Sequence, residues 1–393
     1  MHTNNNLFFA NEDTSIIKFI DQILNDAIAK HASDVHFEPY EECCRIRFRI
    51  DGLLYEITKT EKLLGSRFSA RLKIMANLDI AEKRLPQDGR FTFKVATKQN
   101  QDCRLSVCPT MFGEKLVVRI LNPINISLNI EHLGFNEKER QLFCKHIQMP
   151  QGLILVTGPT GSGKTITLYT ALNVLNQPTK NISTIEDPVE INLHGINQVE
   201  VNHKTGLGFA KTLRTFLRQD PDIIMIGEIR DLETAEIAIK AAHTGHLVLA
   251  TLHTNSALAS LTRLLNMGVP AFNLATAISL IIAQRLIRKL CVHCKQPQIL
   301  PKTVLAENNL EENIIPYTAR GCEHCNQGYY KRIAVFEMLP VTATISELIM
   351  QRCDLGAVEK QMHMLNISTL RAAALNKVQA GITSLEEVNR VII

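Results

Sequence analysis

The chain has 393 residues, which is enough for about two or three domains. Its 43 lysine and arginine residues nearly balance its 39 aspartate and glutamate residues, so the overall charge does not indicate a polyanionic partner. Tryptophan is absent, only six tyrosines are available to stack on bases, and the sequence has no basic stripe with interleaved aromatic residues. We therefore expect no nucleic-acid partner.

The sequence indicates neither a secretory signal nor a membrane span. The first eleven residues have no basic start and no adequate apolar core, and the longest apolar segment, 274–283, is too short to cross a bilayer. We therefore expect a cytosolic protein. Its ten cysteines would stay reduced in that compartment, which favours metal binding over disulfides wherever cysteines cluster.

The first part of the chain predicts an α+β domain over residues 1–122. Apolar residues recur at helical spacing over 14–31, which predicts an amphipathic helix. Residues 45–50 alternate arginine with apolar side chains, which predicts a strand with three guanidinium groups on one face, and Asp51-Gly52 predicts a hairpin turn. We interpret most of these arginines as solvated and expect a minority to reach a ligand, because guanidinium suits phosphate. The other predicted elements are a helix over 61–78 and strands near 91–95, 104–107 and 115–121.

Residues 123–134 have no clear period and indicate a linker. From 135 to 290, helical patterns alternate with buried-strand patterns, which predicts a parallel α/β sheet with a nucleotide at its carboxyl edge.

A phosphate-binding loop occupies residues 158–165, which match G-x-x-x-x-G-K-[ST] at every fixed position. It follows an apolar strand pattern over 153–157 and precedes a helical pattern over 166–175, the context that the motif requires. Glycines let backbone N–H groups turn toward a phosphate at a helix N-terminus. Lys164 would then reach the β- and γ-phosphates, and the Thr165 hydroxyl would bind Mg²⁺. The predicted nucleotide-binding residues of the loop are Gly158, Pro159, Thr160, Gly161, Ser162, Gly163, Lys164 and Thr165.

Two further strand patterns end in polar residues. The apolar run 222–228 ends in Glu228, where Walker B acids organise Mg²⁺ or water, although a strand can also end in glutamate by chance. The strand pattern 247–252 is bracketed by His246 and His253.

Four cysteines form two C-x-x-C pairs separated by 27 residues: Cys291, Cys294, Cys322 and Cys325. This spacing predicts a tetrathiolate zinc site, and the site should be structural because four protein ligands leave no position for water. Redox-active pairs are the alternative, but no thioredoxin-like context surrounds them. We assign 291–340 to the zinc module and 341–393 to a C-terminal helical region.

Taken together, these blocks resemble the secretion ATPase family of type II secretion and type IV pilus assembly. The phosphate-binding loop is followed by residues similar to the family's Asp box (183–190), Walker B signature (217–231) and His box (244–255). Blocks at 33–39, 49–52 and 84–90 also resemble family blocks, so the resemblance covers residues 14 to about 340.

The resemblance implies an ATP hydrolase that uses Mg²⁺, with a RecA-like P-loop core, an N-terminal α+β (PAS-like) domain and a zinc-binding C-terminal part. Glu186 would orient or deprotonate the attacking water and Glu228 would support Mg²⁺ and that water, although the sequence leaves open which glutamate does which. His246 and His253 would position the γ-phosphate. The implied arginine contacts are Arg104 and Arg119 to the phosphates, with Arg214, Arg218 and Arg230 as further candidates for phosphate or intersubunit contacts.

The resemblance also implies a homohexamer that acts on a platform protein of the inner membrane. In this family the zinc cysteines mark assembly motors and are absent from typical retraction motors, which favours assembly. The chain begins almost directly at the block 16–39, so we expect the usual docking domain to be absent, which leaves a cytoplasmic docking protein in question. A retraction motor and a RecA-like nucleic-acid motor are the alternatives. The choice among a pilus, a type II secretion system and a DNA-uptake system stays open.

Overall fold

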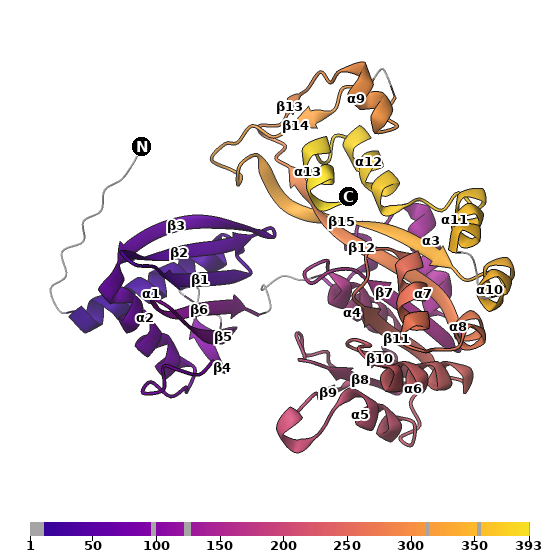
Figure 1. Ribbon diagram of the computed structural model, residues 1–393, viewed down its shortest axis with the longest axis horizontal. Coiled ribbons are helices and arrows are strands. Elements are labelled where there is room, and N and C mark those ends of the chain that lie inside the picture. The colour runs from indigo at the N-terminus through magenta and orange to yellow at the C-terminus, as the bar shows by residue number, and fades with distance from the viewer. Residues whose placement is uncertain (1–11, 96–99, 122–126, 312–313, 352–354, 393) are drawn as a thin grey trace. The chain divides into compact units, whose positions relative to one another are not determined.

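The computed structural model describes residues 12–95, 100–121, 127–311, 314–351 and 355–392. The chain divides into two compact units, which we call unit 1 (Met1–Ile126) and unit 2 (Ser127–Ile393) (Figure 1). This division does not test the predicted limits of the linker, the zinc module or the C-terminal helical region.

Unit 1 is an antiparallel sheet with two helices. The strands lie in the order β3-β2-β1-β6-β5-β4, and every neighbouring pair is antiparallel. Its elements are α1 (Glu12–Ala29), β1 (Asp34–Pro39), β2 (Cys43–Ile50), β3 (Leu53–Glu61), α2 (Lys62–Met75), β4 (Gln87–Lys94), β5 (Asn100–Thr110) and β6 (Gly113–Ile120).

One face of this sheet is apolar and packs against α1 and α2. Leu24 of α1 and Leu72 of α2 are fully buried in a core that includes Phe37 and Phe48 of the sheet. Both predicted helices and the arginine-bearing strand are therefore confirmed. The predicted hairpin turn is also confirmed, because Asp51 and Gly52 both have positive φ angles, 50° and 88°, as a type I′ turn requires.

Strand β1 was not predicted, although residues 34–38 alternate polar with apolar side chains as a strand does. Asp34, His36 and Glu38 are nevertheless buried in the other face of the sheet. The arginines of β2 compensate two of these side chains: Arg47 donates to Glu38 at 2.7 and 2.9 Å, and Arg49 lies 3.7 Å from Asp34. Burial alone would raise the pKa of Glu38, but hydrogen bonds from Arg47 and Arg45 lower it to about 2.

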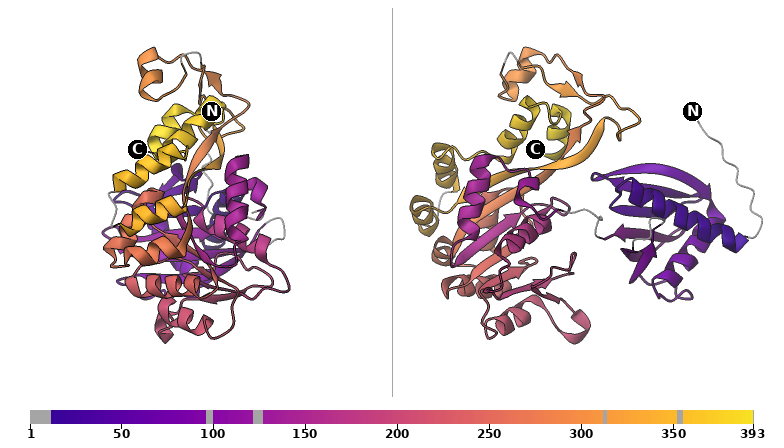
Figure 2. Two further views of the ribbon diagram at one scale, coloured as in Figure 1. Left: turned by 90° about the vertical axis from the view of Figure 1, so that its right-hand side faces the viewer. Right: turned by 180° about the vertical axis from the view of Figure 1, so that it is seen from behind.

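Unit 2 is built on a seven-stranded sheet with the order β15-β12-β7-β11-β10-β8-β9 (Figures 1 and 2). All neighbouring strands are parallel except β15, which is antiparallel to β12. The strands are β7 (Gly152–Thr157), β8 (Ile182–Glu186), β9 (Asn197–Glu200), β10 (Ile223–Ile226), β11 (Leu247–Leu252), β12 (Ile278–Leu290) and β15 (Tyr329–Pro340), with a separate pair, β13 (Gln296–Pro297) and β14 (Tyr317–Thr318).

Helices cover both faces of this sheet. Phe143 of α3 and Leu172 of α4 are buried on one face, and Phe216 of α5 and Ile239 of α6 on the other. The α/β prediction is therefore confirmed. The helices are α3 (Glu137–Ile147), α4 (Lys164–Leu175), α5 (Phe209–Phe216), α6 (Leu232–His243), α7 (Ala257–Asn266), α8 (Ala271–Ala277), α9 (Lys302–Glu307), α10 (Ala343–Met350), α11 (Leu355–Met364), α12 (Leu370–Gln379) and α13 (Leu385–Val391), with short 3₁₀ turns at Ile130–His132 and His203–Thr205.

The antiparallel strand β15 is a feature that the sequence pattern did not predict. Its residues fall at the end of the segment assigned to the zinc module, and they return alongside β12 to the core sheet. The apolar segment 274–283 is divided between the end of α8 and the start of β12. In the part of the chain that the structure describes, no helix has the length and apolar character needed to cross a membrane.

Candidate active site

Four segments of unit 2 meet at the carboxyl edge of the parallel strands. The phosphate-binding loop follows β7, Asp187 follows β8, Glu228 lies two residues beyond β10, and His253 follows β11. The strands are in register, so that Thr157 pairs with Leu252 and Ile226 with both Ala250 and Ile185. The carboxyl edge of such a sheet is where ligands bind in parallel α/β folds.

Glycine is required in the phosphate-binding loop for two reasons. A Cβ atom on Gly158 would lie 2.5 Å from the Gln284 oxygen and 2.5 Å from Ser162 Oγ, so a larger residue would clash with its neighbours. Gly161 has a φ of 79° and open space beside it, so only its backbone conformation demands glycine. The loop leads directly into the N-terminus of α4, whose backbone N–H groups and positive dipole end favour a bound phosphate.

Lys164 is the buried cation of this loop. Its Nζ donates to the carbonyl oxygens of Gly158 at 2.8 Å and Pro159 at 3.1 Å. Burial lowers its pKa to about 8, and the charges of Glu228 and Glu190 partly oppose that shift. A phosphate placed beside Nζ would favour the protonated lysine. The loop and the lysine therefore fit a nucleotide phosphate.

Glu228 faces a cationic and a neutral partner. One carboxylate oxygen pairs with Arg230, and the other lies 3.5 Å from His253 Nε2. Arg230 also lies 3.7 Å from Asp187 Oδ2. Burial, with the nearby charge of Lys164, lowers the pKa of His253, so its imidazole is neutral at neutral pH. A carboxylate and a hydroxyl, from Glu228 and Thr165, are ligands that suit Mg²⁺.

The Glu186 carboxylate is buried and already hydrogen-bonded. Its Oε2 accepts from the Tyr169 hydroxyl of α4, and its Oε1 accepts from Thr184 Oγ1 at 2.6 Å and Gln198 Nε2 at 3.1 Å. The prediction that Glu186 acts on the attacking water is untested. These contacts place the Glu186 carboxylate in a buried hydrogen-bond network, and its role at the attacking water stays a prediction.

Glu190 ends the segment 183–190 that resembles the Asp box. Its side chain is exposed, and its negative charge partly opposes the burial that lowers the pKa of Lys164.

Two predicted residues lie at the opposite edge of the sheet. His246 precedes β11, its Nδ1 donates to the Ala241 oxygen at 3.0 Å, and its own oxygen accepts from Gly152 N at the start of β7. The length of β11 separates His246 from His253 by about 23 Å, at about 3.3 Å per residue. Arg218 precedes β10 and donates to the Arg214 oxygen at 2.8 Å. The structure does not bring His246 or Arg218 to the phosphate-binding loop of the same chain.

Arg104 and Arg119 lie opposite each other on β5 and β6 of unit 1. With Arg90 they line a cavity of about 470 Å³ on the polar face of that sheet. Arg119 Nε donates to Asp34 Oδ1 at 2.9 Å. Asp88 also lines this cavity, and a contact of its arginines with an anionic ligand stays a prediction.

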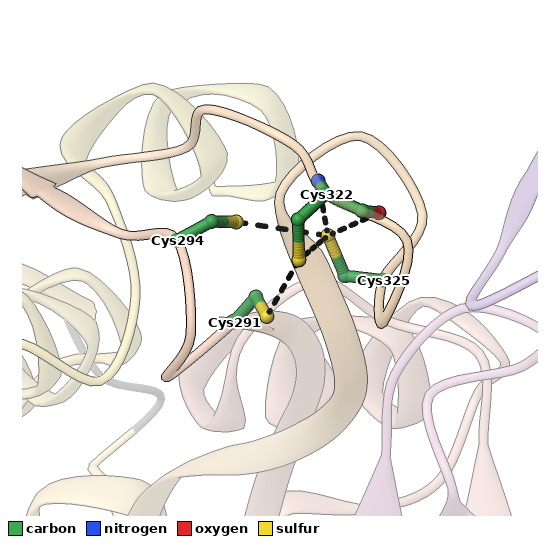
Figure 3. Close-up of side chains that lie close together, drawn as sticks. All are labelled: Cys291, Cys294, Cys322 and Cys325. Carbon is green, nitrogen blue, oxygen red and sulfur yellow. Dashed lines mark hydrogen bonds between the residues drawn. The ribbon is translucent and has the colours of Figure 1, made fainter.

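The four predicted zinc ligands come together (Figure 3). Their Sγ atoms all lie within 4.8 Å of one another, and three pairs are 3.6, 3.7 and 3.8 Å apart. A tetrahedral ion with Zn–S bonds of about 2.3 Å requires S···S distances of about 3.8 Å. The donor set therefore fits a structural zinc ion.

Comparison with known proteins identifies several relatives. A family model described as "Type II/IV secretion system protein" matches residues 10–390. The type IV pilus assembly ATPase PilB of Pseudomonas aeruginosa is 53% identical over 384 residues, which cover 97% of this chain and 68% of that protein. The type II secretion system ATPase E of Vibrio cholerae is 44% identical over 391 residues, 99% of this chain and 77% of that protein.

Solved structures show the same fold. The pilus retraction motor PilT with bound ADP has a TM-score of 0.62 at 28% identity, with 94% of this chain and 96% of that chain covered. The ATPase DotB of Legionella pneumophila has a TM-score of 0.69 at 20% identity, with 95% of each chain covered, and it supports the fold alone.

Proposed function

Because the chain belongs to the type II/IV secretion system protein family, a family of ATP-hydrolysing enzymes, we propose that it hydrolyses ATP to drive assembly of a type IV pilus or a type II secretion pseudopilus. The observation that carries this proposal is the convergence of Lys164, Glu228 and His253 at the carboxyl edge of the sheet. Phosphoryl transfer to water depends on positioning and charge neutralisation, and this group of residues supports the proposal because it offers groups suited to both.

In the proposed reaction, each residue has a role that its surroundings support. The backbone N–H groups of 158–165 and the Lys164 ammonium hold the phosphates. Thr165 and Glu228 would hold Mg²⁺, which when bound neutralises charge on the β- and γ-phosphate oxygens. Glu186, at the end of β8, is our candidate to orient or deprotonate the attacking water, as the resemblance to the family implies. His253 is neutral and next to Glu228, and we propose that its ring N–H donates to a γ-phosphate oxygen.

Several observations favour assembly over retraction. The chain is 53% identical to a pilus assembly ATPase and 28% identical to a pilus retraction motor. It also carries the four-cysteine cluster that we expect of assembly motors.

We propose that the working form is a homohexamer that engages a platform protein and is thereby held at the inner membrane.

A chromosomal Lys164→Ala allele in the source bacterium tests the direction of the motor. Loss of an assembly motor should abolish surface fibres or secretion of exported proteins, whereas loss of a retraction motor should leave fibres in place or increase their number. Electron microscopy of fibres and an assay of secreted protein distinguish a pilus from a pseudopilus. Retained or more abundant fibres would contradict the assembly proposal.

Purified protein tests the hexamer and the unit 1 arginines, whose roles stay predictions. We expect the mass of a hexamer, and we expect Arg119→Ala to lower turnover with ATP affinity and assembly unchanged. If the protein is a monomer and Arg119→Ala leaves ATP turnover unchanged, both the hexamer and the proposed role of Arg119 are contradicted.

A further inference from the structure

The hydroxyl group of Thr157 joins the phosphate-binding loop to the loop that carries His253. Thr157 is the last residue of β7 and directly precedes Gly158, and its side chain is fully buried. The ladder between β7 and β11 ends at this residue, which pairs with Leu252. Beyond that point, Thr157 Oγ1 accepts from Thr254 N at 3.0 Å. The side chain therefore continues the connection between the two strands where their backbone pairing stops.

A second hydroxyl group strengthens this contact. Thr254 Oγ1 lies 2.6 Å from Thr157 Oγ1 and 2.7 Å from Ser260 Oγ of α7. Ser260 is fully buried, and its hydroxyl group donates to the Ser256 oxygen at 3.3 Å. If Thr157 donates to Thr254 and Thr254 donates to Ser260, each hydroxyl proton of the chain has an acceptor. Three hydroxyl groups thus connect the end of β7 to α7.

The residues next to these two threonines belong to the candidate active site. Lys164 Nζ donates at 2.8 Å to the oxygen of Gly158, which directly follows the first threonine. His253 directly precedes the second threonine, and its Nε2 lies 3.5 Å from Glu228 Oε2. A change in the distance between the two threonines would therefore change the distance between the phosphate-binding loop and the His253 imidazole.

We propose that Thr157 is a positioning residue for ATP hydrolysis: through Thr254, its hydroxyl group sets the distance between the phosphate-binding loop and the His253 imidazole. This inference rests on the proposed function, in which the His253 ring N–H donates to a γ-phosphate oxygen. Thr157 acts through its neighbours, because its own side chain is fully buried. Thr157 and Thr254 are called the Thr157–Thr254 pair below.

Arg285 of β12 holds the same loop at the next residue. Its Nη2 donates to the Asn255 oxygen at 3.0 Å and to Asn255 Oδ1 at 3.1 Å, and its guanidinium group is buried. Because the loop keeps this second attachment, we expect removal of the Thr157 hydroxyl group to displace His253 without unfolding the loop. A displacement of a catalytic group by about 1 Å can cost about 100-fold in rate.

The test compares Thr157→Val with Thr157→Ser in the full-length protein, with ATP turnover, ATP affinity and thermal unfolding measured together. Valine keeps the volume of threonine but leaves Thr254 N without its acceptor, whereas serine keeps the hydroxyl group and removes a methyl group. We expect Thr157→Val to lower kcat by about 10- to 100-fold while KM and ATP affinity stay within about twofold of wild type. Thr157→Ser should stay within about threefold of the wild-type kcat. A wild-type kcat for Thr157→Val, or an equal loss in both variants, would overturn the inference.

The matched control is Thr170→Val on α4. The Thr170 side chain is fully buried and, among the residues that the structure describes, its Oγ1 has no hydrogen-bond partner. This control should keep the wild-type kcat, and a loss as large as that of Thr157→Val would overturn the inference. Thr254→Val provides a second variant should Thr157→Val fold poorly. Because it removes the other hydroxyl group, its kcat should fall by at least about threefold with KM unchanged, and a wild-type kcat would contradict the inference.

A double-mutant cycle separates positioning from general destabilisation. His253→Ala removes the imidazole that the Thr157–Thr254 pair is proposed to position. In that background Thr157→Val should change the rate by less than about twofold, as measured by single-turnover hydrolysis with enzyme in excess over radiolabelled ATP. An equal loss with and without His253 would show that Thr157 does not act through the imidazole and would overturn the inference.

The results also distinguish this inference from the proposed function. A wild-type protein without ATPase activity, or full activity in His253→Ala, contradicts the proposed function. An active wild type and an impaired His253→Ala, combined with a wild-type kcat for Thr157→Val, contradict only the role of the Thr157–Thr254 pair.

Discussion

Glu228 Oε2 lies 3.5 Å from His253 Nε2, so the acid beyond β10 and the histidine after β11 face each other at the carboxyl edge of the sheet. The two side chains come from strands that are adjacent in the sheet, and Thr251 Oγ1 donates to the Gly227 oxygen at 2.5 Å beside them. Any nucleotide-dependent movement of one loop therefore changes the surroundings of the other.

Glu228→Gln should retain ATP binding and lose hydrolysis. The amide keeps the size and a hydrogen-bond acceptor but removes the charge that supports Mg²⁺ and the attacking water, so we expect kcat to fall by at least about 100-fold. ATP affinity and turnover of the purified variant check this. The control is Glu236→Gln, an exposed acid on α6, which should turn over normally. Wild-type turnover in Glu228→Gln would contradict the assigned role.

ATP affinity should fall as the pH rises above about 8. In the free protein burial lowers the pKa of Lys164 to about 8, and bound phosphates favour its protonated form. Below pH 8 the lysine is already protonated and binding takes up almost no proton from it. Above pH 8 binding must protonate it, so affinity should fall by up to about tenfold per pH unit.

Calorimetry between pH 7 and pH 9, in buffers with different ionisation enthalpies, measures this proton uptake directly. We expect it to rise from near zero toward one proton per site. His253 does not confound the measurement, because its pKa is lowered and it is neutral throughout this range. Affinity that is constant from pH 7 to pH 9 would show that the Lys164 pKa is not lowered.

The sequence predicted those parts of the site that depend on local spacing. The loop 158–165, the turn at Asp51-Gly52 and the four zinc cysteines each need particular residues at fixed separations, and all lie as expected. The roles of the acids depend instead on which way a side chain points. Glu186 and Glu190 are four residues apart, but only the structure shows that the first is buried against Tyr169 and the second is exposed.

Long-range pairing was harder to predict than local structure. The two histidines that bracket β11 looked equivalent in sequence, yet a strand has two ends and only His253 lies at the carboxyl edge. Strand β15 was hard to predict for a similar reason. Its apolar residues indicate a buried strand, but they do not indicate that this strand pairs with β12 in the antiparallel direction. The burial of the polar residues of β1 was not foreseen, because it depends on pairing with the arginines of the neighbouring strand β2.

Loss of the zinc ligands should destabilise the end of β12 and leave ATP binding intact. Cys291 N donates to the Gly328 oxygen at 2.8 Å, and Leu290 N donates to the Ile382 oxygen at 2.8 Å, so the cysteine cluster anchors the C-terminal segment. We expect Cys291→Ser to remove bound zinc and lower the unfolding temperature by about 5 °C or more. Elemental analysis and thermal unfolding measure both effects.

Cys108→Ser is the matched control, because Cys108 is an exposed cysteine of β5 and should change neither zinc content nor stability. ATP affinity should be the same in both variants. Stoichiometric zinc in Cys291→Ser would contradict the tetrathiolate assignment. Loss of ATP binding in that variant would contradict the structural role.

Glu337→Ala should loosen two helices at once. The buried Glu337 side chain lies on β15, where its Oε1 accepts from Ala257 N at 2.8 Å and its Oε2 accepts from Leu370 N at 3.2 Å. These are the first residues of α7 and α12, so one carboxylate satisfies a free N–H group at each helix N-terminus and complements both helix dipoles. Without it, both N–H groups would be buried and unpartnered.

We expect Glu337→Ala to lower the free energy of unfolding by about 3 kcal/mol, at about 1.5 kcal/mol for each charge-assisted hydrogen bond. Hydrogen exchange should accelerate in peptides that cover the starts of α7 and α12. Glu347→Ala, an exposed acid on α10, should change the free energy by less than about 0.5 kcal/mol. Because α7 begins four residues after His253, faster hydrogen exchange at the start of α7 would show that β15 stabilises the loop beside the nucleotide. Unchanged exchange at the starts of both α7 and α12 would contradict the proposal that Glu337 caps both helices.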